Sequence, residues 1–557
     1  MDRQPPRATN DEIDLYIRTY YSLLRSSGEV MVRAFEEAHT YSSSSLHAGA
    51  RDPVPDVAAF GYSAARLPAA MPLVRRIVMG QSHEHFERAA LPVQTWRRLR
   101  TRGRRRPLRW NGGDTLAVFL SSTSDIDDLI PIVTAYQIEW NKLHDALGGT
   151  PDPERLGLDP HGLDQLRAAL GPEWKQGLAQ IAARRCDLSV RLLAGTYEQY
   201  QRASQRWWSG IEPAYLRPEP PRRRPIYFVS SNTHSLVNLL GGYAREHQGQ
   251  IVDFARRADP EGLAEPLSRA LASGDDALVA NLTYYLLRTF LRDKEEDEPR
   301  RVAEVQAWDA ESGITSLDTP GQLDVAAQLI DIAALRPDRM DPRVRLPGDE
   351  LLSRSDAVIL NIDYPLGMAA YHHLSRVAQG VGEIRGLYVM GKAATLNGRV
   401  GDVIISSVVH DEHSGSTYLF KNCFSAQDVQ PWLRAGTVLD GQKAVAVRGP
   451  FLQNRDYMSV FYREGYTVLE MEAGPYLSAL YEMVSPKRYP TNEVVHLSTI
   501  TPFDVGVLHY ASDTPYSKRE SLLSKSLSFF GVDSTYASAV AMVRQLLKLE
   551  IARIQRG

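Results

Sequence analysis

From about residue 225 onward, short apolar runs alternate with helical segments, and this alternation restricts the possible folds more than any other feature of the sequence. Buried strands are expected at 225–231, 356–362, 385–391, 402–409, 443–449, 466–472 and 494–500. Segments with helical spacing follow several of these strands, for example at 365–379. Strands that alternate with helices predict an α/β domain, with a central mixed sheet flanked by helices.

The first 210 residues or so show apolar residues at helical spacing instead. This spacing recurs in 11–40, 61–100, 125–147 and 161–209. Ser124 precedes the third segment as a candidate N-cap, and glycine follows that segment as a candidate C-cap. These patterns predict a part of the chain that is mostly α-helical.

The chain is long enough for more than one domain. Its 557 residues exceed what one ordinary core supports, and the Pro- and Arg-rich stretch 212–225 is the best candidate linker. We expect a mostly α-helical N-terminal domain over 1–220, with a regulatory or oligomerisation role. An α/β domain is expected over 221–557, with a mainly helical insertion at about 250–350.

The composition is that of an ordinary globular protein. Hydrophobic residues make up 43% and charged residues 24%, and the net charge is −3. The net charge gives no general attraction to nucleic acid or to an anionic membrane, so we expect neither partner. Two distant cysteines and the lack of a long apolar run lead us to expect a cytoplasmic protein. The basic stretch 96–110 is interpreted as a solvated helix end and loop, with RNA, an acidic partner or a polyphosphate as the alternative ligand.

Three segments occur in an order typical of one enzyme superfamily. Residues 363–415 contain a helix, a strand, a glycine-containing turn and "GDVIIS"; residues 468–482 contain "LEMEAG"; residues 508–520 contain "ASDTP". Together they resemble the purine nucleoside phosphorylase and nucleosidase superfamily, and AMP nucleosidases in particular. The resemblance covers roughly 225–245 and 355–550. It implies cleavage of the N-glycosidic bond of a purine nucleotide or nucleoside, and it implies a homo-oligomer.

The resemblance assigns the sugar site to the segment "LEMEAG". Glu472 is expected to accept hydrogen bonds from the 2′ and 3′ hydroxyls of the ribose, because a carboxylate accepts two at once. Met471 is expected to lie against the sugar as a soft apolar surface. Glu470 alternates to the other face of the strand, so we assign it no role. Ordinary strand-end residues are the alternative for both Met471 and Glu472.

Two further residues match the family pattern near the purine base. Asp513, in "ASDTP", is the expected proton donor to the leaving base, and a turn residue is the alternative. Phe451, about twenty residues before the Met-Glu pair, is expected to stack on the base. A core phenylalanine is the alternative for that position.

A phosphate group would be recognised elsewhere. Ser231, Asn232, Thr233 and His234 follow the first strand at the start of a helix, a place suited to a 5′-phosphate. Plain N-capping explains Asn232 or Thr233 equally well. Gly391 belongs to the glycine-containing turn, where Lys392 departs from the family pattern. The lysine would contact a phosphate of the substrate, or would block the site that inorganic phosphate uses in phosphorylases.

The residue that activates water is not assigned by the sequence. Nucleosidases of this superfamily commonly use an early glutamate, but none follows "PIYFVSSN" until Glu246. Asp411 and Glu412 are candidates, with a solvated turn as the alternative. A phosphorylase and a nucleotide-sensing protein without catalysis therefore remain open. No cofactor is expected, and no metal, because "SHEHFE" and "HDEH" lack the spacing of a zinc motif.

Overall fold

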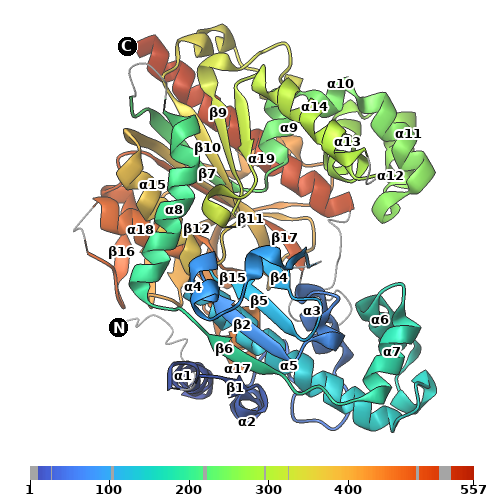
Figure 1. Ribbon diagram of the computed structural model, residues 1–557. Helices are drawn as coiled ribbons and strands as arrows, with labels where there is room; N and C mark the ends of the chain where they lie inside the picture. Colours follow the sequence, from blue (N-terminus) through green and yellow to red (C-terminus); the bar gives the residue numbers. More distant parts are fainter. Residues whose placement is uncertain are drawn as a thin grey trace.

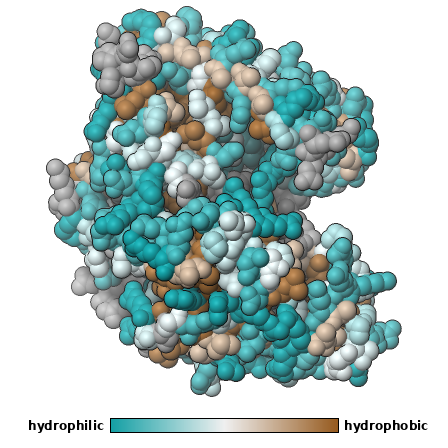
Figure 2. Space-filling view, in the orientation of Figure 1, coloured by the Kyte–Doolittle hydropathy of each residue, from teal (hydrophilic) through white to brown (hydrophobic). Residues whose placement is uncertain are grey.

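The computed structural model describes residues 11–26, 28–101, 106–216, 222–293, 297–323, 325–484, 488–513 and 529–556. Within these ranges no helix is both long enough and apolar enough to cross a bilayer. The face shown in Figure 2 is mostly hydrophilic, and its outline is indented between the insertion helices and the N-terminal part of the chain.

The N-terminal part contains a sheet that the sequence analysis did not predict. In the described residues six strands pair in the order β1-β6-β2-β5-β4-β3. Their bounds are β1 (Val30–Met31), β2 (Arg76–Gly80), β3 (Arg97–Leu99), β4 (Leu108–Trp110), β5 (Thr115–Phe119) and β6 (Ser189–Leu192). The strands have two to five residues, and β5 is buried on both faces. Such short strands lack the alternation that would separate them from helices.

Helices pack around this sheet. They are α1 (Asp11–Ser26), α2 (Arg33–Tyr41), α3 (Val57–Arg66), α4 (His83–Arg88), α5 (Thr123–Leu147), α6 (Pro160–Leu170) and α7 (Trp174–Ala183). The next helix, α8 (Tyr197–Tyr215), packs mainly in the core of the larger sheet. The predicted helix at 125–147 is confirmed as α5, but its N-cap is Ser122 and Ser124 lies inside the first turn. Gly148 ends α5 in the left-handed conformation, as its sequence position predicted.

The larger sheet is mixed, as predicted, and comprises eleven strands of the described chain. Its path is β16-β13-β12-β14-β15-β11-β7-β10-β9-β8, with β17 paired to both β11 and β12. The bounds are β7 (Pro225–Ser231), β8 (Ile314–Leu317), β9 (Ala327–Asp331), β10 (Val358–Asp363), β11 (Glu383–Thr395), β12 (Val403–Asp411), β13 (Ser416–Leu419), β14 (Val438–Ala446), β15 (Tyr466–Glu470), β16 (Val494–His496) and β17 (Asp504–Asp513). Because β17 pairs with two strands, the ring β11-β15-β14-β12-β17 closes on itself.

Helices cover both faces of this sheet (Figure 1). They are α9 (Ser235–Gly241), α10 (Tyr243–Glu246), α11 (Gln248–Ala258), α12 (Ala264–Ser273), α13 (Asp276–Leu291), α14 (Glu298–Ala310), α15 (Met368–Gly380), α16 (Ala426–Val429), α17 (Arg455–Arg463), α18 (Ala473–Val484) and α19 (Phe529–Arg556). Alternate residues of β7 reach the two layers: Tyr227 packs in the core that contains α9, α13 and α19, whereas Phe228 packs in the core of α8, α15 and α18. The insertion is helical from α11 to α14 and then adds β8 and β9 to the sheet.

A short segment of the α/β part belongs to the N-terminal core. Phe451 and Leu452 are buried there, and the backbone of Arg455 bonds to that of Ser43. Just before this segment, Arg448 contacts Asp127 of α5, with 3.2 Å between Nη2 and Oδ2. The hydroxyl of Tyr20 donates to the other carboxylate oxygen at 2.5 Å. The two parts of the chain are thus joined by buried polar contacts.

Replacing Arg448 by alanine is expected to lower the free energy of unfolding by about 2–3 kcal/mol. The reason is that Asp127, whose side chain is 1% exposed, would lose its cation. The expected loss is smaller than for a fully buried pair because 29% of the Arg448 side chain is exposed. Urea unfolding measures the difference, and Arg455→Ala, at an exposed position, should stay within about 0.5 kcal/mol of wild type. Equal losses in the two variants would contradict this role.

Candidate functional site

Several strands of the larger sheet bring their polar residues to one edge. Ser231 at the end of β7 is paired with Asp363 at the end of β10. On the neighbouring strand β11, Gly391 lies opposite His509 of β17. Glu470 at the end of β15 reaches the same level, since its Oε2 lies 3.8 Å from Nε2 of His509. Ligands of α/β sheets bind beyond the carboxyl ends of strands, so this edge is the candidate site.

The Glu-Met-Glu segment forms the tight connection between β15 and α18. Met471 and Glu472 are partly exposed, and Met471 packs against a small core cluster. Glu470 is buried, and its Oε2 accepts hydrogen bonds from the backbone N–H groups of Glu472 and Ala473, both at 2.7 Å. Glu470 thus has a structural role, because this side chain holds the turn that positions Glu472. Among the described atoms, Oε1 of Glu470 has no hydrogen-bond partner.

Burial raises the pKa of Glu470 to about 8, and the nearby charge of Glu472 adds to the rise. In the unfolded chain a glutamate loses its proton near pH 4.3. Between these two values the folded state binds more protons, so this contribution to stability is present at low pH and is lost as the pH rises toward 8.

Glu470→Gln is therefore expected to gain stability relative to wild type as the pH rises from 5 to 8, by up to about 1.4 kcal/mol per pH unit. Glutamine keeps the acceptor oxygen for the two backbone N–H groups but carries no ionisable proton. Urea unfolding at the two pH values measures the change, with Glu464→Gln as an exposed control. A difference between Glu470→Gln and wild type that is the same at both pH values would contradict the assigned protonation state.

Two tyrosines, Tyr364 and Tyr476, interact electrostatically with Glu472, and the sequence analysis missed both. The hydroxyl of Tyr364, directly after β10, lies 3.0 Å from that of Tyr510 in β17. Burial raises the pKa of Tyr364 well above its usual value, and Tyr510 and Glu472 add to the rise. Burial also raises the pKa of Tyr476, with a further contribution from Glu472. Tyr476 follows Glu472 by four residues, one helical turn, and this spacing is the signal that was available in the sequence.

The turn after β7 is organised by its own side chains. The hydroxyl of Ser231 donates to Oδ1 of Asn361 at 2.8 Å. Oδ1 of Asn232 accepts from the backbone N–H groups of His234 and Ser235, at 3.1 and 2.7 Å, so the capping alternative is present. The carbonyl oxygen of Thr233 accepts from Gln328. A phosphate at this turn stays a prediction.

Gly391 and Lys392 lie on opposite faces of β11. A Cβ atom on Gly391 would lie 3.6 Å from the ring of Tyr364, so this face adjoins the tyrosine pair. Lys392 is exposed and acts electrostatically on Glu261 of the insertion. Glu261 accepts a hydrogen bond of 2.7 Å from Tyr285, whose ring centroid lies 6.1 Å from that of His234. The insertion thereby connects Lys392 with the turn after β7.

The structure places Asp513 and Phe451 in different parts of the molecule. Asp513 is the last residue of β17 and is paired with Ala394 of β11. Residues 514–520 of its motif lie outside the described residues. Phe451 is 1% exposed in the N-terminal core, and its ring contacts those of His39, His47 and Tyr62. The structure thus does not bring Phe451 to the sheet edge, and the core alternative describes its position.

The two acids at the end of β12 differ in their surroundings. Asp411 is buried, and its carboxylate accepts from the side chains of His413, Ser414 and Ser478 at 2.8–3.0 Å. The alternative that Asp411 belongs to a solvated turn is therefore wrong, because its side chain is buried. Burial raises the pKa of Glu412 to about 7, and its Oε2 accepts from the backbone N–H of Arg448 at 3.0 Å. Of the two, Glu412 is the one that exchanges protons near neutral pH.

His413 connects Asp411 with the N-terminal part of the chain. Its Nδ1 lies 3.0 Å from Asp411 Oδ1, and its Nε2 lies 3.2 Å from the hydroxyl of Ser124 in α5. That hydroxyl also accepts from the backbone N–H of Met368 at 2.9 Å. Ser124 is fully buried, so this Ser-His-Asp chain anchors α5 to the sheet edge and is closed to a substrate. In the part of the chain that the structure describes, no group of three or more His, Cys, Asp or Glu side chains is placed to hold a metal ion.

A family model described as "Family of unknown function (DUF6909)" matches residues 32–548. The comparison with curated proteins found no match.

Solved structures with similarity to part of the chain include two nucleosidases and a phosphorylase. A putative methylthioadenosine nucleosidase from Weissella paramesenteroides is 11% identical, with a TM-score of 0.29, over 44% of this chain and 93% of that one. The 5′-methylthioadenosine nucleosidase of Arabidopsis thaliana is 8% identical, with a TM-score of 0.29, over 58% and 96%. Uridine phosphorylase from Schistosoma mansoni is 11% identical, with a TM-score of 0.25, over 34% and 72%. Similarities of this size carry no argument about activity.

Proposed function

The chain belongs to the family of unknown function DUF6909, and we propose that it is an N-ribosyl hydrolase that cleaves the N-glycosidic bond of a purine nucleotide. The observation that carries this proposal is the position of Glu472 and Met471. They follow β15 at the sheet edge where β7, β10 and β11 also place their polar residues. A carboxylate beside a thioether, at the end of a buried strand, suits a ribose.

Glu472 binds the two ribose hydroxyls, and Met471 covers the apolar face of the sugar. Glu470 stays protonated at neutral pH and keeps the backbone of Glu472 in place through the two hydrogen bonds described above. A protonated neighbour leaves Glu472 as the single negative charge of the pair, which stabilises the positive charge that builds on the ribose during cleavage.

The reaction replaces the bond from C1′ of the ribose to the purine nitrogen by a bond from C1′ to a water oxygen. Asp513 gives a proton to the leaving base. Glu412 takes the proton of the attacking water, a role that fits its pKa of about 7 and the full engagement of its neighbour Asp411. The products are free purine base and ribose phosphate.

A nucleotide is favoured over a nucleoside by the surroundings of Lys392. Through Glu261 and Tyr285, this lysine is connected to His234 at the turn after β7. A 5′-phosphate between them would meet a lysine charge and the polar turn 231–234. We propose further that the N-terminal part regulates the site, because Ser124 and Asp127 of α5 bond to His413 and Arg448.

The proposal is tested by comparing AMP with adenosine, each with and without inorganic phosphate. Faster release of adenine from AMP, unchanged by added phosphate, is the expected result. Release that requires phosphate would indicate a phosphorylase. Nucleotide binding without any release would indicate a sensing protein, in keeping with the missing early glutamate.

A further inference from the structure

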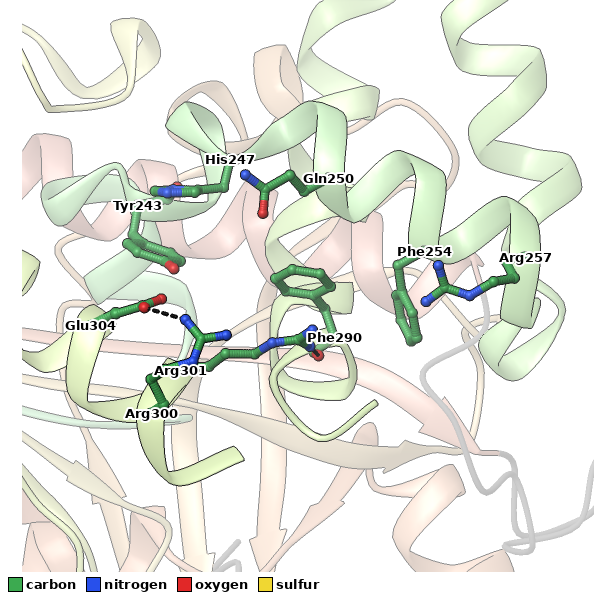
Figure 3. Close-up of a pocket in the computed structure, with 9 residues that line it drawn as sticks. All are labelled: Tyr243, His247, Gln250, Phe254, Arg257, Phe290, Arg300, Arg301 and Glu304. Atoms are coloured by element: carbon green, nitrogen blue, oxygen red, sulfur yellow. Dashed lines mark hydrogen bonds and ion pairs between the residues drawn. The ribbon is translucent and has the colours of Figure 1, made fainter. Parts of the chain in front are cut away.

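A separate cavity of about 420 Å³ lies among the insertion helices α10, α11, α13 and α14 (Figure 3). This volume is in the range of small-molecule sites. None of the residues at the sheet edge described above lines it. Because neither the sequence motifs nor the proposed reaction uses its lining residues, the cavity requires an explanation of its own.

Aromatic rings form two walls of this insertion cavity. On one side Tyr243 stacks on His247, with ring centroids 4.0 Å apart and an angle of 19° between the rings. On the other side Phe254 and Phe290 pack edge to face at 5.7 Å. Figure 3 shows the amide of Gln250 directed toward the space between the two walls. Walls of this kind accept a flat ring by stacking or edge contacts.

The charged lining of the insertion cavity has an excess of cations, since Arg257, Arg300 and Arg301 face a single carboxylate, that of Glu304. Arg301 is held in place: its guanidinium lies 4.7 Å from the centre of the Phe290 ring, and its Nη1 donates to the Phe290 carbonyl oxygen at 2.6 Å. Nη1 of Arg300 donates to Glu304 at 2.5 Å.

Two further carboxylates, Asp293 and Asp297, lie next to these arginines and hold them in position, so the three named arginines are matched by three named carboxylates. Arg257 donates to Asp293 at 2.7 Å, and Asp297 lies 3.7–3.8 Å from Arg301 and Arg300. A guanidinium has five N–H donors in a planar fork. The hydrogen bonds described above use only some of these five donors, so each arginine can also donate to a bound anion. Phosphate groups suit this geometry because they accept two parallel N–H bonds.

We propose that the insertion cavity binds a phosphorylated small molecule that carries a flat ring. The phosphate lies against Arg300 and Arg301, and the ring lies between the Tyr243–His247 wall and Phe290. Glu304 pairs with the guanidinium of Arg300 and is released from it when the ligand binds. The proposal is independent of the N-glycosidic activity.

Phenyl phosphate is the probe, because it has a flat ring and a phosphate but no glycosidic bond. Isothermal titration of the full chain at pH 7.5 is expected to give one bound phenyl phosphate that Arg300→Gln weakens at least about tenfold. Glu304→Gln is expected to tighten binding, because it removes the competing carboxylate. Arg269→Gln is the matched control: Arg269 makes the same kind of exposed i,i+4 pair, with Glu265, outside the cavity.

Phenol and inorganic phosphate separate the two parts of the ligand, and both are expected to bind more weakly than phenyl phosphate. Binding of phenol as tight as that of phenyl phosphate would overturn the assignment of the arginines. An unchanged affinity in Arg300→Gln would place the probe elsewhere, for instance at the turn 231–234, and would overturn the proposal. The same loss in Arg269→Gln would show a general charge effect and would overturn it too.

Discussion

Replacing Asp513 by asparagine is expected to lower the rate of base release by about 10²- to 10⁴-fold. Asparagine has nearly the shape of aspartic acid but cannot give a proton to the departing purine. A purine leaves poorly as an anion, so the barrier to bond cleavage rises while the ground-state contacts remain. The effect should therefore appear in kcat, with little change in the dissociation constant of the nucleotide.

Asp504→Asn is the matched control for this prediction. Asp504 begins the same strand, β17, at the end away from the site, and its carboxylate accepts from Gln545 of α19. Single-turnover release of adenine and equilibrium binding of AMP are measured for both variants. Unchanged turnover in Asp513→Asn would contradict the assignment of the proton donor, and an equal fall in both variants would point to damage to β17.

Replacing Glu472 by alanine is expected to weaken both binding and turnover. The change removes the acceptor for two ribose hydroxyls and the negative charge near the cation that forms on the sugar. Each hydrogen bond to a charged group contributes about 1.5–3 kcal/mol, so the loss of two should lower kcat/KM roughly 10²- to 10⁴-fold. Glu472→Gln keeps an acceptor without the charge, and it should recover binding more than turnover.

Steady-state kinetics with AMP measure these changes. Glu464→Ala, at an exposed position at the end of α17, is the control and should behave as wild type. The fold of each variant is checked by its urea transition, and the hydrogen bonds of the turn from the backbone N–H groups of Glu472 and Ala473 to Glu470 are expected to remain. Wild-type kinetics in Glu472→Ala would contradict the proposal that Glu472 binds the ribose at this edge of the sheet.

The sequence predicted the larger sheet better than the N-terminal part. The run 225–231 coincides with β7, and β15 begins and ends within two residues of its predicted bounds. These strands are five and seven residues long, contain a run of apolar residues and are bounded by clear turn signals. β2 lies within 61–100, which was interpreted as helical, whereas β5 lies between the predicted helical segments and was not assigned to any element. The strands β8 and β9 were also not predicted, because they lie within the insertion at 250–350, which was interpreted as mainly helical.

Some site residues could be placed from the local sequence, whereas others depend on how distant segments pack together. The position of Glu472 and Met471 directly after a strand followed from local sequence. The role of Glu470 did not, because strand alternation places it on the opposite face and says nothing about the turn that its carboxylate holds. Tyr364 meets Tyr510 across 146 residues of sequence, a pairing that only the sheet topology creates. Phe451 was assigned by its distance from the Met-Glu pair, whereas its segment packs into the N-terminal core.

The central claim is that this edge of the sheet cleaves an N-glycosidic bond. The most direct measurement is chromatography of the products after the purified protein is incubated with AMP in phosphate-free buffer. The account predicts free adenine and ribose phosphate in equal amounts, formed about 10²- to 10⁴-fold more slowly by the Asp513→Asn variant. AMP recovered intact after prolonged incubation, with ATP, GMP, adenosine and inosine also intact, would contradict it.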